Sequence, residues 1–185
     1  MEKATISITS IGSATHAAKR AADIVFILQN KEQVGDAILT RRLNETFRTY
    51  GEKDSEVTSR DLFDLRFVAD MLYEVFATKS TDDIAHLLNG ILARYAGAPR
   101  LSMHGGAPWH LHVDSDDHAP WAQWFAASSA LGLAILLAEK QRNPGGLCAS
   151  CGRPFIDLGK GGGRHYCSPR CATRERVAAY RKRGR

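Results

Sequence analysis

Cysteine is missing from the first 147 residues of the sequence, and all four cysteines fall between Cys148 and Cys171. A disulfide-stabilised secreted fold spreads its bridges through the chain, so this clustering argues against one. No apolar run reaches the length of about 18 residues that a membrane-spanning helix needs. The first residues also lack the apolar segment of a signal peptide. The sequence therefore predicts a cytoplasmic protein that has no membrane partner.

Catalytic signatures are missing as well. The sequence has no G-x-S-x-G, no phosphate-binding P-loop, no H-E-x-x-H and no dinucleotide fingerprint. The adjacent acidic pairs Asp82-Asp83 and Asp116-Asp117 point different ways and make poor acid–base dyads. We therefore expect a binding protein without catalytic residues, and not an enzyme.

Acidic residues are scarce at the C-terminal end. Residues 141–185 hold 11 lysines and arginines against two acids, Asp157 and Glu175, which gives a formal charge of +9. The preceding 140 residues hold the remaining 14 basic and 18 acidic residues, a charge of −4. This split favours contact with a polyanion through one end of the chain. The alternative is a basic tail that only aids solubility.

Helical spacing of apolar residues runs through most of the first 142 residues. It predicts helices at 14–29, 36–50 and 60–78, another between a cap at Ser80 or Thr81 and Gly97, and a long one from Pro120 to Gln141. Ser59 is expected to cap the third helix. The long helix is apolar almost all round and is therefore predicted to be the central one.

Alternating apolar and polar residues predict two β elements in the same region. A short strand is expected at 3–11, and a hairpin between Arg100 and Val113 with its turn at Gly105-Gly106. The expected fold class is thus mainly α with a small antiparallel β-hairpin or sheet, followed by a C-terminal module.

Histidines and aromatic residues gather around the predicted hairpin. The histidines are either a second metal or ligand site or exposed hairpin residues; they are His104, His110, His112 and His118. The aromatic residues either line a small-molecule pocket or, as is more common, belong to the core; they are Trp109, Trp121, Trp124 and Phe125.

The cysteines are spaced C-x2-C-x15-C-x3-C, and all four are candidate metal ligands: Cys148, Cys151, Cys167 and Cys171. Two residues between paired cysteines let both thiolates face one point, and four thiolates form a closed tetrahedral shell for Zn²⁺. Because no coordination position stays open, we expect one structural zinc ion. The alternatives are two disulfides, four unconnected thiols, or an iron–sulfur cluster, which also takes four cysteines.

The residues around the cysteines indicate a C-terminal treble-clef-like zinc finger. Gly152 permits a tight turn after the first pair. Residues 155–157 and 164–166 are expected to pair as a hairpin across the glycine-rich turn between them. Ser168 is expected to cap a final helix whose first turn holds Cys171.

Asn143-Pro144-Gly145-Gly146 separates the two parts of the chain and is expected to form a hinge. The predicted organisation is a helical domain at 1–142, a linker at 143–146 and the zinc finger with its basic helix at 147–185.

The final helix is too basic to be a core element. Guanidinium groups suit phosphates and guanine edges, so its cations and two from the preceding segment are candidate nucleic-acid contacts: Arg153, Arg164, Arg170, Arg174, Arg176, Arg181, Lys182 and Arg183. The competing interpretation is that this helix docks onto acidic groups of another protein or of its own body, where Asp114, Asp116 and Asp117 are candidates.

The cysteine module resembles the CGNR zinc finger family. The resemblance rests on the run Cys148 to Asp157, on Arg164 to Ser168, and on the Cys171 helix with Arg174, Val177, Tyr180 and Arg181. The N-terminal part looks like the ABATE domain which that family carries. The sequence departs from the family at the fourth ligand, where Cys171-Ala172-Thr173-Arg174 replaces Cys-Gly-Asn-Arg. Alanine is a good helix former, so the turn should survive.

The resemblance implies a bacterial, stress-linked transcription regulator with its finger on DNA and the ABATE domain as a sensor. The residues themselves favour a zinc-containing protein that binds nucleic acid, most simply double-stranded DNA. A single finger binds weakly, so we expect a homodimer that presents two basic helices; no small-molecule effector is identified. The alternative is a protein-interaction adaptor whose basic finger docks onto an acidic partner.

Overall fold

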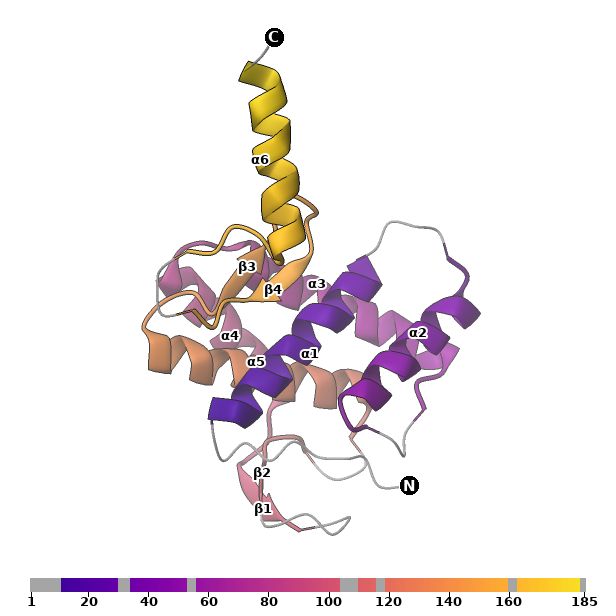
Figure 1. Cartoon of the computed structure of the whole chain (residues 1–185). Coiled ribbons are helices and arrows are strands. Elements are labelled where there is room, and N and C mark those ends of the chain that lie inside the picture. The colour runs from indigo at the N-terminus through magenta and orange to yellow at the C-terminus, as the bar shows by residue number, and fades with distance from the viewer. Residues whose placement is uncertain are drawn as a thin grey trace.

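The computed structural model describes residues 11–29, 34–52, 56–103, 110–115, 119–159 and 163–183 (Figure 1). Its helices are α1 (Ile11–Gln29), α2 (Asp36–Thr49), the 3-10 turn η1 (Ser59–Asp61), α3 (Leu62–Ala77), α4 (Thr81–Tyr95), α5 (Trp121–Lys140) and α6 (Pro169–Arg183). The strands β1 (Arg100–Ser102) and β2 (His110–His112) form one antiparallel pair, and β3 (Gly145–Leu147) and β4 (Pro154–Ile156) form another. The predicted fold class is confirmed. The strand expected at 3–11 lies outside the described residues except for Ile11, which begins α1.

Helix α5 is the central element of the body, as predicted. It packs against α1, α3 and α4, and most of its residues are buried on all sides. Within the described part of the chain, only α5 is long and apolar enough to cross a membrane by length and composition, but 61% of that stretch is buried inside the protein. Such burial is that of a core helix.

Small residues bring α1 and α5 close together. A Cβ atom on Gly132 of α5 would lie 2.8 Å from the Cβ of Ala17 and 3.0 Å from the carbonyl oxygen of Ala14. Ala126 and Ala130 on the same helix are fully buried. The alanine-rich sequence of α1 therefore sets a short distance between the two helices, as ridge-and-groove packing of small side chains allows.

An ion pair is buried inside this core, which the sequence pattern did not predict. Arg20 of α1 is fully buried and donates to Glu52 and to the Ser128 hydroxyl, in each case over 2.7 Å. Its guanidinium carbon lies 4.1 Å from the ring centroid of Trp124. Burial lowers the pKa of Arg20 to about 10 and raises that of Glu52 to about 7, while their mutual attraction opposes both shifts.

The aromatic residues predicted as either pocket or core belong to the core. Trp121, Trp124 and Phe125 are buried, and all three contact the ring of Phe47 at centroid distances of 4.6–6.4 Å. Trp109 lies outside the described residues. The interpretation of the other three as core residues is confirmed.

Two helix starts test the capping predictions. Ser80 caps α4 by accepting from the backbone of Asp83, as expected. The prediction that Ser59 caps the third helix is wrong, because Ser59 lies inside η1, whose N-cap is Thr58, and the N-cap of α3 is Asp61. Thr58 and Asp61 form a capping box, the T-x-x-D pattern that satisfies the first free amides reciprocally.

The β1–β2 hairpin buries His112, which the sequence left either as a ligand or as an exposed residue. Its ring lies 3.2 Å from the Asp114 carboxylate, and Arg100 donates to the same carboxylate over 2.9 Å. Asp114 is therefore already paired and is not a docking point for α6, which stands at the opposite end of the molecule (Figure 1). His104, His118, Asp116 and Asp117 lie outside the described residues, as does the side chain of His110.

The segment expected to act as a hinge is held by the body. The Asn143 side chain donates to the Thr78 carbonyl over 3.0 Å and accepts from the amide of Gly145 over 2.9 Å. Gly145 and Gly146 then enter β3, and Leu147 packs on the main core together with Ile156 of β4. The finger therefore begins from a fixed strand pair that lies against α1 and α3.

The close α1–α5 contact gives the first testable prediction. Gly132→Val should lower the free energy of unfolding by about 2 kcal/mol or more, because the new side chain overpacks a contact that already excludes a Cβ. Gly90→Val is the matched control: Gly90 lies in α4 with nothing within 4 Å of its Cβ position. Thermal or urea unfolding measures the two variants, and equal effects would contradict the packing argument.

Candidate metal centre

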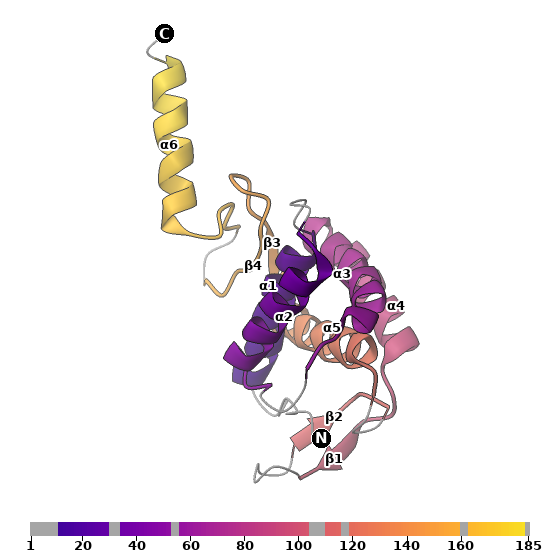
Figure 2. The ribbon, with the colours of Figure 1, turned by 90° about the vertical axis from the view of Figure 1, so that its right-hand side faces the viewer.

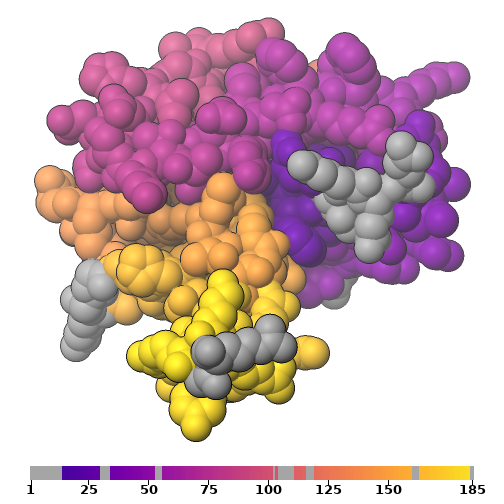
Figure 3. All heavy atoms as spheres, turned by 90° about the horizontal axis from the view of Figure 1, so that it is seen from above, coloured from indigo at the N-terminus to yellow at the C-terminus, as the bar shows by residue number. Residues whose placement is uncertain are grey.

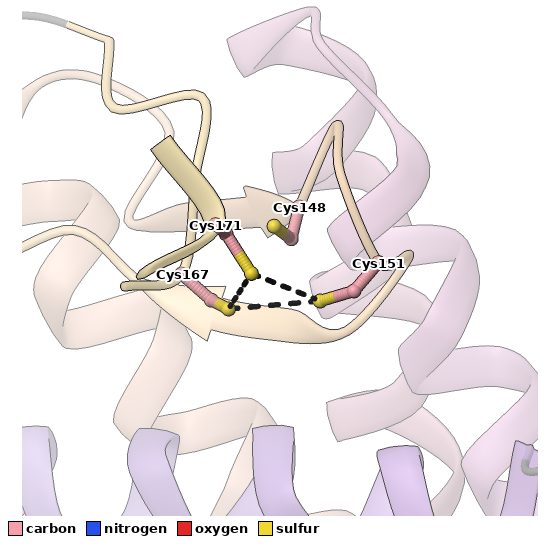
Figure 4. A group of neighbouring side chains, drawn as sticks. All are labelled: Cys148, Cys151, Cys167 and Cys171. Atoms are coloured by element: carbon pink, nitrogen blue, oxygen red, sulfur yellow. Dashed lines mark hydrogen bonds between the residues drawn. The ribbon is translucent and has the colours of Figure 1, made fainter. Parts of the chain in front are cut away.

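Four cysteine side chains converge at the base of α6. Cys148 follows β3, Cys151 lies in the next turn, Cys167 precedes α6 and Cys171 lies in its first turn. Figure 4 shows the sulfur atoms of Cys151, Cys167 and Cys171 forming a triangle, with Cys148 directed toward it from one side. All four cysteines are free of disulfides.

The spacing of the sulfur atoms fits a tetrahedral metal ion. The three sulfur–sulfur distances among Cys151, Cys167 and Cys171 are 3.7, 3.7 and 3.8 Å, and all four sulfur atoms lie within 4.8 Å of one another. A tetrahedron with zinc–sulfur bonds of about 2.3 Å has edges of about 3.8 Å. A disulfide would need about 2.05 Å. The donor set therefore fits one structural zinc ion with no open coordination position.

Backbone hydrogen bonds shape the first cysteine pair. The amide of Cys148 donates to the Arg153 carbonyl over 2.9 Å, and the amide of Gly152 donates back to the Cys148 carbonyl over 2.8 Å. Gly152 adopts φ +71°, a left-handed conformation that only glycine takes without strain. The amide of Ala149 donates to the His165 carbonyl over 2.9 Å, which joins the first cysteine pair to the segment carrying the second.

The start of α6 positions the second pair as the sequence predicts. The Ser168 hydroxyl accepts from the amide of Cys171 over 3.3 Å, and Pro169 is the first helical residue. The thiolates of Cys167 and Cys171 thus lie at the positive N-terminal end of the helix, where negative charge is stabilised. The amide of Ala172 donates to the Ser168 carbonyl, so Ala172-Thr173 continues the helix, as expected from the helix propensity of alanine.

The thiols of the cluster ionise unequally. Burial would raise the pKa of Cys148, but backbone hydrogen bonds from Cys167, Ser150 and Cys151 outweigh it and lower that pKa to about 6. Burial and contacts with the neighbouring sulfur atoms raise the pKa of Cys167 to about 12, and burial also raises the pKa of Cys151. Four thiolates therefore coexist here only around a cation, and binding that cation must release protons.

The finger has almost no hydrophobic core apart from the metal ligands. Its buried cluster consists of Cys148, Phe155 and Cys171, with Tyr166 and Cys167 partly buried against it. So few apolar side chains cannot offset the conformational entropy of the segment. Metal binding is therefore the main source of folding free energy in this part of the chain.

The hairpin predicted between residues 155–157 and 164–166 is wrong. β4 pairs instead with β3, in the register Gly145 to Ile156 and Gly146 to Phe155. Gly145 makes this pairing possible, because a Cβ there would lie 2.2 Å from the Phe155 carbonyl oxygen. His165 is exposed and does not belong to the group of metal-ligating side chains found among the described residues.

Asp157 anchors the loop after β4 to the end of α5. It accepts from Arg142 over 3.0 Å and from the amides of Gly159 and Arg164. Burial would raise its pKa, but these donors lower it below its usual value. The carboxylate is thus held ionised between the body and the finger.

Two of the arginines predicted to contact nucleic acid are engaged within the protein. Arg153 forms a 2.7 Å ion pair with Asp23 of α1, and its guanidinium lies 4.7 Å from the ring centroid of Phe26. Arg164 donates to the carbonyls of Tyr166 and Cys167. These contacts fix the finger on the body and close the loop around the third cysteine.

Arg174 supports the metal cluster, a role that sequence reasoning missed. Its guanidinium donates to the carbonyl and the hydroxyl of Ser150 over 2.7–2.9 Å and reaches 4.0 Å from the Cys171 sulfur. The Ser150 hydroxyl in turn donates to Glu175 over 2.8 Å. The available signal was the spacing, since residues three apart on a helix share a side.

The other predicted nucleic-acid residues lie on α6 and are exposed: Arg170, Arg176, Arg181, Lys182 and Arg183. Among their described contacts is one from Arg176 to the Thr173 hydroxyl over 3.1 Å. These side chains therefore do not serve to hold the finger together.

Removal of the metal should unfold the finger and leave the body folded. A chelator removes the ion, and Cys171→Ser removes one of its four ligands in the small cluster, whereas the main core is a separate and larger one. Limited proteolysis should then cut within α6, while the main thermal transition persists.

Zinc affinity should fall as pH is lowered, because protons compete for the thiolates. Titration at two pH values measures this, and a pH-independent affinity would contradict the tetrathiolate site.

Arg174→Ala should weaken zinc binding by about 10- to 100-fold, the usual effect of losing a group that orients a metal ligand. Arg170→Ala is the matched control, since it removes the same charge from an exposed position of the same helix. Competition with a chelating dye measures the affinity of each variant. Equal losses in the two would show that general charge, and not the Ser150 contact, sets the affinity.

Comparison with known proteins agrees with this geometry. No curated protein matches the chain. The part that contains the four cysteines and α6, residues 146–184, matches the family model described as CGNR zinc finger, and within it Cys148, Cys151, Cys167 and Cys171 fit one structural zinc ion.

Proposed function

We propose that this chain is a cytoplasmic, zinc-containing transcription regulator that binds double-stranded DNA through α6. The helical body would act as a sensor or dimerisation unit, and the proposed role is binding, not catalysis. The observation that carries the proposal is the position of α6, which stands clear of the body (Figures 1 and 2) and whose basic side chains are largely exposed.

The shape of α6 suits the major groove. Of its 15 residues only Cys171 is buried, and Figure 3, which views α6 end-on, shows its yellow atoms beside the orange ones near one edge of the molecule. Such a helix is about 22 Å long and 10–12 Å wide with its side chains. The major groove of B-DNA is about 12 Å wide and admits one helix. The zinc site at its base would hold the helix at a fixed angle as it enters.

The charge of α6 supports a polyanion as partner. Its only acid is Glu175, which is half-buried and accepts from Ser150. The outer turns hold Arg181, Lys182 and Arg183. All side chains from Val177 to Arg183 are exposed, so these turns are surrounded either by water or by a binding partner. Phosphates would gain from these cations through counterion release.

The structure divides the eight predicted contact residues by their use in the protein. We propose that Arg153, Arg164 and Arg174 serve mainly to hold the finger in place, since each has partners within the chain. The DNA contacts would then come from the exposed cations of α6, which are Arg170, Arg176, Arg181, Lys182 and Arg183. Tyr180, which is 75% exposed, lies among them and offers a hydroxyl to phosphate.

Regulation requires more than one finger. A single small finger has weak affinity, and two linked fingers gain through effective concentration. We therefore propose a homodimer that presents two copies of α6. The resemblance to CGNR proteins with an ABATE domain extends the proposal to stress-linked regulation in bacteria.

The salt dependence of DNA binding tests the mechanism. Lys182→Ala/Arg183→Ala should reduce the slope of log affinity against log salt by about 2, because each lost phosphate contact removes about 0.9. The matched control is Arg41→Ala/Lys79→Ala, which removes two exposed cations from the body and should leave the slope unchanged. Fluorescence anisotropy on zinc-loaded protein and random-sequence duplex DNA provides the measurement.

A flat salt dependence of the unaltered protein would exclude this mechanism. In that case the finger would be an adaptor for an acidic protein. Capture of such a partner would survive nuclease treatment and fail with Arg181→Glu.

A further inference from the structure

The first turns of α3 expose two aromatic side chains to solvent. Phe63 is 80% exposed and Phe67 is 45% exposed. They lie four residues apart and so on one side of the helix. A phenylalanine this exposed is costly in water, and contiguous exposed apolar surface marks an interaction site.

A hollow of about 430 Å³ lies directly beside these rings. It runs between α3, the C-terminal end of α4 and the start of α5, and its lining includes Phe67, Arg94, Tyr95 and Pro120. The Arg94 guanidinium lies 5.1 Å from the ring centroid of Phe67 and 5.3 Å from that of Tyr95. The hollow is thus mostly apolar, has Arg94 and Asp64 in its lining, and has a volume larger than that of one benzyl side chain.

We propose that this surface, the Phe63 patch (Phe63, Asp64, Phe67, Arg94, Tyr95 and Pro120), is where two copies of the chain meet across a two-fold axis. An interface of that symmetry needs a projection and a recess on the same surface, so that each copy fills the other. Phe63 belongs to the lining of the hollow but is 80% exposed, so it can serve as the projection while the hollow is the recess. Each Phe63 therefore enters the hollow of the partner copy.

The charged residues around the hollow would also form favourable pairs between two copies related by the same two-fold axis. Asp64 and Arg94 both border it, and Asp64 is exposed. A two-fold axis places the Asp64 of one copy near the Arg94 of the other, twice in the dimer. An unrelated acidic or basic partner would meet one favourable and one unfavourable charge here, whereas a second copy meets two favourable pairs.

The position of the Phe63 patch leaves α6 free. Phe63 lies in the first turn of α3, a helix of 16 residues and so about 24 Å long. Thr78, just beyond the other end of α3, accepts from Asn143 at the entrance to the finger. Pairing through the patch therefore keeps both fingers away from the interface. This inference rests on the homodimer of the proposed function, but not on DNA binding.

Sedimentation across the micromolar to millimolar range, without DNA, tests the interface. Phe63→Ser should weaken self-association by roughly 100-fold, since a central aromatic is lost twice in one dimer. Leu101→Ser is the matched control. Leu101 is likewise an exposed apolar residue, at 66%, but it lies on β1 outside the patch, so its replacement should leave self-association unchanged. Circular dichroism confirms that each variant is folded.

Exchanged charges provide the sharper test. Asp64→Arg alone and Arg94→Asp alone should each weaken self-association, because like charges then face one another across the axis. An equimolar mixture of these two variants should form a heterodimer, because both facing pairs become complementary. A monomeric unaltered protein, or a mixture that fails to associate, would overturn the interface. The salt dependence of DNA binding by α6 would be unaffected by either result, so the two proposals fail separately.

Discussion

The structure of the C-terminal quarter depends on four thiolates that share one cation. Without that cation, thiols within 4.8 Å of one another resist joint ionisation, and burial together with the neighbouring sulfur atoms raises the pKa of Cys167. Phe155 and Tyr166 are too few to form a core in place of the metal. The zinc therefore supplies the folding free energy, and it also sets the direction of α6, whose first turn holds the fourth ligand. An exposed helix with no packing of its own acquires a defined orientation only through this point of attachment.

Contacts between the finger and the helical body set the orientation of the finger relative to that body. β4 lies against α1, Arg153 pairs with Asp23, and Asp157 binds Arg142 at the end of α5. These contacts connect the metal site to the helices around α5 without a flexible segment among the described residues. In the proposed dimer, the contact between the two helical bodies would therefore fix the separation and relative direction of the two α6 helices. Recognition of paired half-sites on DNA depends on such a fixed separation.

Local patterns in the sequence were sufficient to predict the helices and the metal ligands. Apolar spacing located all five body helices to within a few residues, and the cysteine spacing identified the ligands. The partner of β4 was missed because alternation reveals a strand but not its neighbour, and the deciding feature was the room that Gly145 leaves beside Phe155. Arg20 was missed for a similar reason: its burial depends on Glu52 and Ser128, which are distant in sequence. The contact of Arg174 with Ser150 likewise spans 24 residues.

The formal charge of the tail exceeds the charge that α6 can offer to a partner. Arg153 is neutralised by Asp23 and Arg142 by Asp157, while Arg174 is bound to Ser150 beside Glu175. Of the exposed cations of α6, Arg181, Lys182 and Arg183 lie in its last turn, where positive charge stabilises the negative end of the helix dipole. Helix stability and phosphate contact thus draw on the same residues. Helix content alone cannot separate these roles, whereas the number of counterions released on binding reports only the charges that meet phosphate.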